Sequence, residues 1–278
     1  MVAEQVTGPV AYHGEGPVWS ESWGGLRFVD MLAGDVLSLE ADGSIGRRHV
    51  AGIAAATRPR REGSAVIGIE RGFALEEADG TIVTLDELWD DPNQRMNDGG
   101  CDPDGRFYCG SMTYDKRPGA AALYRLDPDR SVHVVLEGVT ISNGLEWSPD
   151  GALAYYNDTD TYRTDVFDYG FESGLTGRRP FVETPEHRPD GLTVDADGGV
   201  WVAYPHEGKV RRYSREGALD EVVEVPTVKT TACAFGGADL DTLYITTSRE
   251  NVEGDPLAGS LFRAEVGVRG IPVRAFAG

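Results

Sequence analysis

Two short segments of the chain place an oxygen-bearing side chain directly before a glycine and the start of an apolar run. They are Ser142-Asn143-Gly144 and Pro189-Asp190-Gly191, about 47 residues apart, and a similar Asp-Gly turn follows each of them. One structural unit therefore occurs twice. In a fold built from radial repeats, Asn143 and Asp190 face a common centre, where hard oxygen ligands suit a divalent cation.

Two other segments have the same form, because Glu15 lies directly before a glycine and Asn97 lies two residues before one. Each dipeptide alone is an ordinary turn signal, but four at corresponding positions, one of them a poor turn former, favour a functional set. Glu15, Asn143 and Asp190 offer two carboxylates and one amide oxygen. This set suits Ca²⁺, Zn²⁺, Mg²⁺ or Mn²⁺, with positions left for water and substrate. Asn97 is a fourth ligand or a substrate contact.

Short runs of aromatic and β-branched residues, bounded by Gly, Pro, Asp or Asn, predict strands of about 4–6 residues along the whole chain. Turns recur in two interleaved series with a period of about 46 residues. One series comprises Asp102–Gly105, Ser148–Gly151 and Asp195–Gly198. The other comprises Ala78–Gly80, Asp127–Asp129, Glu172–Gly174 and Arg215–Gly217. Two hairpins per period predict an all-β six-bladed propeller with four-stranded blades, one domain over residues 1–278. A β-sandwich with chance spacing is the alternative, and Asp86–Asp90 is expected to form one helical turn.

Composition limits the classes of partner and compartment. The chain has 278 residues and a formal net charge of −20, which disfavours binding to nucleic acid. Its three cysteines have no metal-site spacing, which suits a reducing compartment. The N-terminus has no basic and apolar run and no segment approaches 18 apolar residues, so we expect a cytoplasmic protein without a membrane partner, either monomer or weak homo-oligomer.

Motifs along almost the full length resemble the regucalcin and gluconolactonase family, the SGL group that includes luciferin-regenerating enzyme. They are Gly14–Trp19, Leu26–Asp30, Arg95–Gly99, Asp102–Arg106, Gly110–Met112, Ser142–Ser148, Tyr155–Thr159, Pro189–Asp195, Gly199–Ala203, Ala234–Gly237 and Leu243–Thr247. The resemblance implies a six-bladed propeller that binds one divalent metal ion, with Ca²⁺ as our first choice, and hydrolyses sugar lactones.

The same resemblance implies roles for individual residues. Glu15, Asn143 and Asp190 correspond to the metal ligands, and Asp190 also corresponds to the general base. Arg95 and Asn97 correspond to residues that hold the substrate. Asp115 falls where some members have an acidic substrate contact, although the segment after it is short here. The segment Thr57–Arg61 departs from the family pattern, and we expect it at the pocket mouth.

The expected reaction is attack of water on the carbonyl of a small-molecule lactone, with Asp190 as base. A Gly-x-Ser-x-Gly motif is absent, so a serine nucleophile is not indicated. Two alternatives stay open: an organophosphate or aryl-ester hydrolase on the same scaffold, and a non-catalytic calcium-binding regulatory propeller. His187, as a proton shuttle or loop residue, and His206, at the rim, have no settled role. Trp19, Trp147 and Trp201 are interpreted as packing residues of the blade cores rather than as platforms for a sugar ring.

Overall fold

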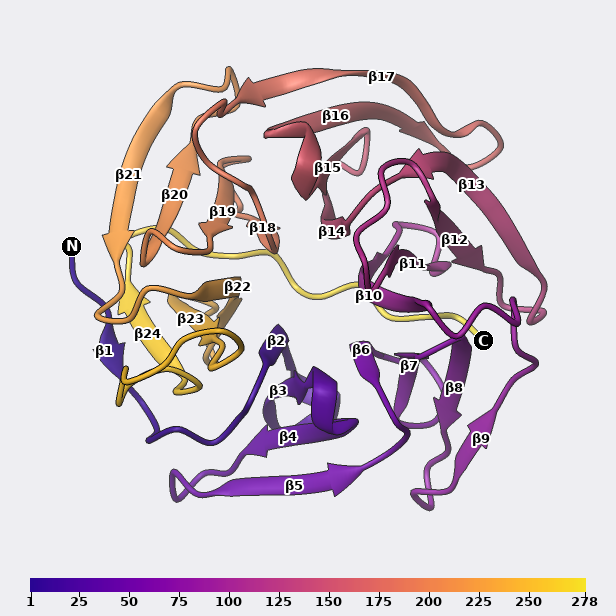
Figure 1. The fold of residues 1–278 in the computed structure, drawn as a ribbon, viewed down its shortest axis with the longest axis horizontal. Helices are drawn as coiled ribbons and strands as arrows, with labels where there is room; N and C mark the ends of the chain where they lie inside the picture. Colours follow the sequence, from indigo (N-terminus) through magenta and orange to yellow (C-terminus); the bar gives the residue numbers. More distant parts are fainter.

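The computed structural model describes residues 1–278 and consists of six four-stranded antiparallel sheets arranged in a ring around a central axis (Figure 1). The first three blades are β2 (Gly14–Ser20), β3 (Gly25–Asp30), β4 (Asp35–Leu39) and β5 (Ile45–His49); β6 (Ala54–Pro59), β7 (Ala65–Ile69), β8 (Gly72–Glu76) and β9 (Ile82–Thr84); and β10 (Gln94–Cys101), β11 (Phe107–Thr113), β12 (Ala121–Leu126) and β13 (Val132–Val139). The next two are β14 (Ser142–Trp147), β15 (Leu153–Asp158), β16 (Arg163–Gly170) and β17 (Gly174–Glu183); and β18 (Leu192–Val194), β19 (Val200–Tyr204), β20 (Lys209–Tyr213) and β21 (Leu219–Glu224). The predicted six-bladed propeller is confirmed, and the β-sandwich is excluded.

The sixth blade combines both ends of the chain. It contains β22 (Thr230–Gly236), β23 (Thr242–Thr247) and β24 (Phe262–Glu265), and its outer strand is β1 (Glu4–Gln5) from the N-terminus. Glu4 pairs with Arg263 in this antiparallel contact. The pairing joins the first and last parts of the chain, so the ring of blades is held closed by backbone hydrogen bonds.

The C-terminal segment runs across the propeller, drawn in yellow in Figure 1. The backbone N–H of Phe276 donates to Pro59 O at 2.8 Å, and that of Ala277 donates to Gly105 O at 2.8 Å. Arg274 donates to the carboxylate of Glu146 at 3.1 Å. The segment therefore ties the fourth blade to the second and third.

Helical structure is limited to three single turns, η1 (Glu21–Trp23), η2 (Met31–Ala33) and η3 (Thr159–Thr161). The prediction of a helical turn at Asp86–Asp90 was wrong. The N–H of Leu88 donates instead to Arg71 O at 2.9 Å, and Leu88 and Trp89 pack against the core of the second blade. No helix of the structure is both long enough and apolar enough to cross a membrane.

Large aromatic side chains fill the spaces between neighbouring blades. Trp147 and Trp201 are fully buried. Trp147 meets Tyr108 edge-to-face with ring centroids 5.2 Å apart, and Trp201 meets Phe235 in the same way at 5.9 Å. Edge-to-face contacts of this kind stabilise packed cores. The interpretation of these tryptophans as packing residues is confirmed, and the inner strands are thus held in a rigid frame.

Candidate active site at one end of the channel

The inner strand of several blades contains one extra residue at the candidate site. In β2 the register shifts between Glu15 and Val18, and β10 and β14 shift in the same way over the segments that contain Asn97 and Asn143. Such bulges bend a strand and change the direction of a side chain. The bulges explain why Glu15, Asn97 and Asn143 leave the ordinary alternation of the sheet and face the channel.

A small hydrogen-bond network links the loop of Asn143 to that of Asp190. Asn143 Nδ2 donates to Thr159 Oγ1 at 2.7 Å, and the Thr159 hydroxyl donates to Pro189 O at 2.8 Å. Asn157 Nδ2 donates to the backbone carbonyl of Asp190 at 2.7 Å. Residues at the end of the second strand of one blade therefore position the candidate ligand of the next.

Five of the six predicted site residues line one cavity of about 260 Å³: Glu15, Arg95, Asn97, Asn143 and Asp190. The sixth, Asp115, does not line it. Its side chain is half exposed and lies 3.4 Å from Arg117 Nε. The structure therefore brings together the residues of the four inner loops, and a substrate contact by Asp115 stays a prediction.

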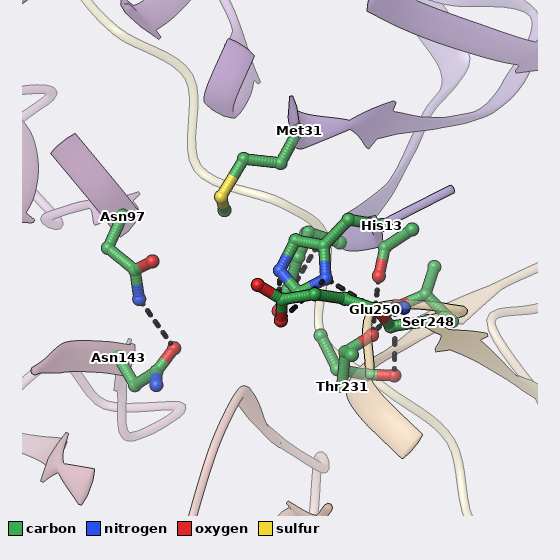
Figure 2. A network of polar contacts seen from close by, with 12 residues as sticks. His13, Met31, Asn97, Asn143, Thr231, Ser248 and Glu250 are labelled. Carbon is green, nitrogen blue, oxygen red and sulfur yellow. Dashed lines mark hydrogen bonds and ion pairs between the residues drawn. The ribbon is translucent and has the colours of Figure 1, made fainter. Parts of the chain in front are cut away.

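A chain of side-chain contacts runs across the floor of this cavity. Arg95 Nη1 donates to Asn97 Oδ1 at 2.7 Å, and Asn97 Nδ2 donates to Asn143 Oδ1 at 3.1 Å, the contact seen at the left of Figure 2. Asn97 Nδ2 also donates to the carbonyl of Ser142 at 2.7 Å. Because Asn143 donates through its nitrogen to Thr159, its oxygen is the atom turned toward Asn97.

Glu15 and Asp190 are both buried. Burial, together with the nearby carboxylates of Asp190 and Asp98, raises the pKa of Glu15 well above its ordinary value. Burial and Asp98 likewise raise the pKa of Asp190. Placing two carboxylates in one buried cavity is unfavourable unless a cation accompanies them.

The residues present fit a divalent cation. The nearest base to Glu15 is the His13 imidazole, with Nε2 at 3.8 Å from Oε1, and Asp190 forms no ion pair. The site holds no group of three His, Cys, Asp or Glu side chains suited to a metal, so the Asn143 amide oxygen is needed to complete a set of three. Two carboxylates and one amide oxygen match the preference of hard cations.

A family model described as SMP-30/Gluconolactonase/LRE-like region matches residues 13–249. The chain belongs to this family. Regucalcin of Gallus gallus is 37% identical to it over 285 residues, and the match covers 95% of each chain. Among solved structures, regucalcin from Agrobacterium tumefaciens superposes with a TM-score of 0.93 at 26% identity, covering 99% of this chain and 97% of the other. Luciferin-regenerating enzyme gives a TM-score of 0.91 at 28% identity, with 100% and 99% covered. The family predicted from the sequence motifs is confirmed.

Beside the five predicted residues that line the cavity lies a polar network that the sequence did not reveal (Figure 2). His13 Nδ1 lies 2.7 Å from Ser248 Oγ and 3.9 Å from Glu250 Oε2, and Lys229 Nζ donates to Glu250 at 2.7 Å. Burial lowers the pKa of His13 to about 3, so the imidazole is neutral. One signal was available for Lys229, since it directly precedes inner strand β22, and Asp190 likewise lies just before β18, with only Gly191 between them.

The structure also places the other residues for which the sequence suggested a role. His206 lines the cavity, whereas His187 lies outside it and pairs with Glu207. The segment Thr57–Arg61 was expected at the mouth, and this was wrong. It is not among the lining residues, and Arg58 borders a separate space of about 40 Å³ with Ile271. The reason is that Thr57 and Arg58 lie in the second half of β6, whereas the site residues lie at the starts of inner strands.

Proposed function

We propose that the protein is a divalent-metal-dependent lactonase that opens a sugar lactone to the aldonic acid. Its membership of the SMP-30/gluconolactonase family supports a hydrolase of this class. The observation that carries the proposal is a single cavity that contains two buried carboxylates, neither paired with a charged base, and the buried guanidinium of Arg95. A binding site for cation and substrate together requires both features, because a pure ion site has no use for Arg95.

Glu15, Asn143 and Asp190 are the proposed ligands of the ion. A divalent ion held there polarises a carbonyl oxygen and lowers the pKa of a nearby water. Relatives are consistent with calcium, since the Agrobacterium tumefaciens regucalcin is described as a calcium-binding protein. We propose Ca²⁺ for this chain, with Zn²⁺, Mg²⁺ and Mn²⁺ as the alternatives that the same oxygen ligands accept.

The remaining steps belong to side chains of the protein. Asp190 accepts a proton from the attacking water as general base. Arg95 and Asn97 orient the lactone. Arg95 donates toward the oxygen on which negative charge develops. Asn97 contacts the lactone as an acceptor through Oδ1, because both hydrogens of its Nδ2 are donated to Ser142 and Asn143. The fixed contact between Arg95 and Asn97 holds both groups in place before substrate arrives. The bond between the carbonyl carbon and the ring oxygen then breaks, and the proton held by Asp190 passes to the leaving ring oxygen. The product is the ring-opened acid, whose new carboxylate oxygen comes from the water.

The test measures proton release in a pH-stat for a panel of aldonolactones, with paraoxon and an aryl ester assayed beside them. The protein is first treated with a chelator, and Ca²⁺, Zn²⁺, Mg²⁺ and Mn²⁺ are then added back singly. We expect lactone hydrolysis to disappear on chelation and to return with at least one ion. Faster turnover of paraoxon would favour the organophosphate hydrolase, and metal binding without turnover of any substrate would favour the non-catalytic regulatory protein.

A further inference from the structure

The candidate active-site cavity gathers basic side chains in a strongly acidic protein. The chain has a formal net charge of −20 and only three lysines. Two of the three, Lys116 and Lys229, line this one cavity together with Arg95 and Arg188. Local charge of the opposite sign to the whole molecule concentrates ligands of the complementary sign. The cavity is therefore suited to an anionic molecule that the rest of the surface repels.

Two of the four cations are already neutralised by carboxylates of the protein. Lys229 Nζ lies 2.7 Å from Glu250 Oε2. Arg188 is paired with Asp160. These two pairs leave Arg95 and Lys116 as the cations of the cavity that have no carboxylate within ion-pair distance.

Arg95 is a buried charge with no carboxylate within ion-pair distance, and Glu250, Glu15 and Asp190 act on it only from farther away. Only 7% of the residue is exposed, and its hydrogen bonds go to neutral groups through Nη1. Its Nε is buried and has no hydrogen-bond partner. A buried guanidinium without an anionic partner is costly. Such an arrangement is expected where a ligand supplies the missing acceptor.

Lys116 provides the second free cation, at the rim. It lies in the turn after β11 with a φ of 54°, and its backbone N–H donates to Thr113 O at 2.9 Å. No carboxylate lies within ion-pair distance of its ammonium group, and its charge acts on Glu250 only from farther away. Lys229, Arg188 and Lys116 line the same cavity as His206, and their charges add to the effect of burial in lowering the pKa of His206.

Glu15 and Asp190 do not cancel the two free cations, because a divalent ion at the proposed metal site takes up both carboxylates. We propose that the lactone accepted by this cavity carries an anionic substituent, a carboxylate or a phosphate, whose charge Arg95 and Lys116 balance. This inference rests on the proposed lactonase function and narrows its substrate class. The inference predicts that the protein prefers acidic sugar lactones to neutral aldonolactones as substrates.

The test compares three lactones on the full-length, metal-loaded protein: neutral glucono-lactone, the carboxylate-bearing glucaro-1,4-lactone and 6-phosphoglucono-lactone. We expect kcat/KM for one of the anionic lactones to exceed that for the neutral one by about tenfold or more at low salt. The advantage should shrink between about 0.01 M and about 1 M salt, because the Debye length falls over this range. Comparison of glucaro-1,4-lactone with 6-phosphoglucono-lactone then shows whether a carboxylate or a phosphate is the anion recognised.

The Lys116→Ala variant should lower the ratio of anionic to neutral kcat/KM about tenfold at low salt. Lys209→Ala is the matched control, since it removes the same charge from the only other lysine, on β20 and outside the cavity. Calorimetric titration with glucarate, an open-chain dicarboxylate, gives a readout besides turnover. Its binding should weaken in Lys116→Ala and not in Lys209→Ala.

The possible failures are distinguishable. Equal kcat/KM for neutral and anionic lactones, with no effect of salt or of Lys116→Ala, overturns the inference and leaves the lactonase function standing. Absence of turnover for all three lactones with every metal overturns the proposed function, and the inference falls with it. Equal effects of Lys116→Ala and Lys209→Ala also contradict the inference, because they reveal only the net charge of the protein.

Discussion

Asp30 and Asp158 hold the starts of two inner strands in the same way. The carboxylate of Asp30, at the end of β3, accepts the backbone N–H groups three and two residues before Glu15, at 3.0 and 2.9 Å. The carboxylate of Asp158, at the end of β15, accepts those three and two residues before Asn143, at 3.1 and 3.0 Å. Each of these two blades therefore repeats both the candidate ligand and the aspartate that fixes the backbone in front of it.

Replacing Asp158 with alanine should release the start of β14. Two N–H groups would lose their acceptor, so we expect the free energy of unfolding to fall by about 2–4 kcal/mol. Metal affinity should fall about 10–100-fold, as for other outer-shell partners of ligands. Urea denaturation and Ca²⁺ titration measure the two effects. The control is Asp129→Ala in an exposed turn, where Asp129 accepts one N–H at 3.0 Å. Equal destabilisation by both variants would contradict the assigned role.

Gly144, directly after Asn143, should not tolerate a side chain. A Cβ there would lie 2.4 Å from the backbone nitrogen of Leu192 and 2.9 Å from Asp190 O. We expect Gly144→Ala to destabilise the fold by about 1–3 kcal/mol through overpacking and to displace Asp190. Gly8→Ala is the matched control, since nothing lies within 4 Å of its Cβ. Thermal unfolding and metal titration of both variants check this, and unchanged metal affinity in Gly144→Ala would show that the two loops are not coupled.

Asp190 is expected to be essential for turnover. Asp190→Asn keeps the size of the side chain but removes the proton acceptor, so kcat should fall at least about 100-fold, and Asp190→Ala should abolish activity. The variants should keep the circular dichroism spectrum of the propeller. Asp197→Asn, an exposed turn residue of the same blade, serves as the control and should keep its rate. Full kcat in Asp190→Ala with metal bound would show that another group is the base.

Alkaline pH should destabilise the fold through its buried tyrosines. Burial raises the pKa of Tyr108, Tyr156 and Tyr204 above the ordinary value of 10. Above pH 10 the unfolded chain has lost protons that the folded chain keeps, so the free energy of unfolding falls as pH rises. The slope is about 1.4 kcal/mol per pH unit for each tyrosine, or about 4 kcal/mol for the three.

Guanidinium unfolding between pH 9 and 11, followed together with phenolate absorbance at 295 nm, tests this expectation. Phenolate absorbance from the buried tyrosines should appear only as the protein unfolds. Tyr108→Phe, which keeps the ring, should reduce the slope by up to about 1.4 kcal/mol per pH unit. A folded protein that ionises all of its tyrosines near pH 10 would disprove the effect of burial.

Much of the architecture could be read from the sequence because a propeller repeats a local pattern. Each strand, turn and glycine of a blade is specified by neighbours within about 46 residues, so the period and the positions of Glu15, Asn143 and Asp190 were visible in the chain. The bulges in β2, β10 and β14 were not visible, although the glycine that follows each of these site residues was their signal.

Contacts between the two ends of the chain were decided only by the tertiary structure. His13 meets Ser248 across 235 residues of sequence, because β2 and β22 are neighbours only after the ring of blades closes. The same closure places Lys229 and Glu250 at the cavity, while a turn after β11 leaves Asp115 outside it and Lys116 at its rim. Local sequence specifies a blade, but the packing of six blades and the conformations of the loops between strands determine which side chains share the channel.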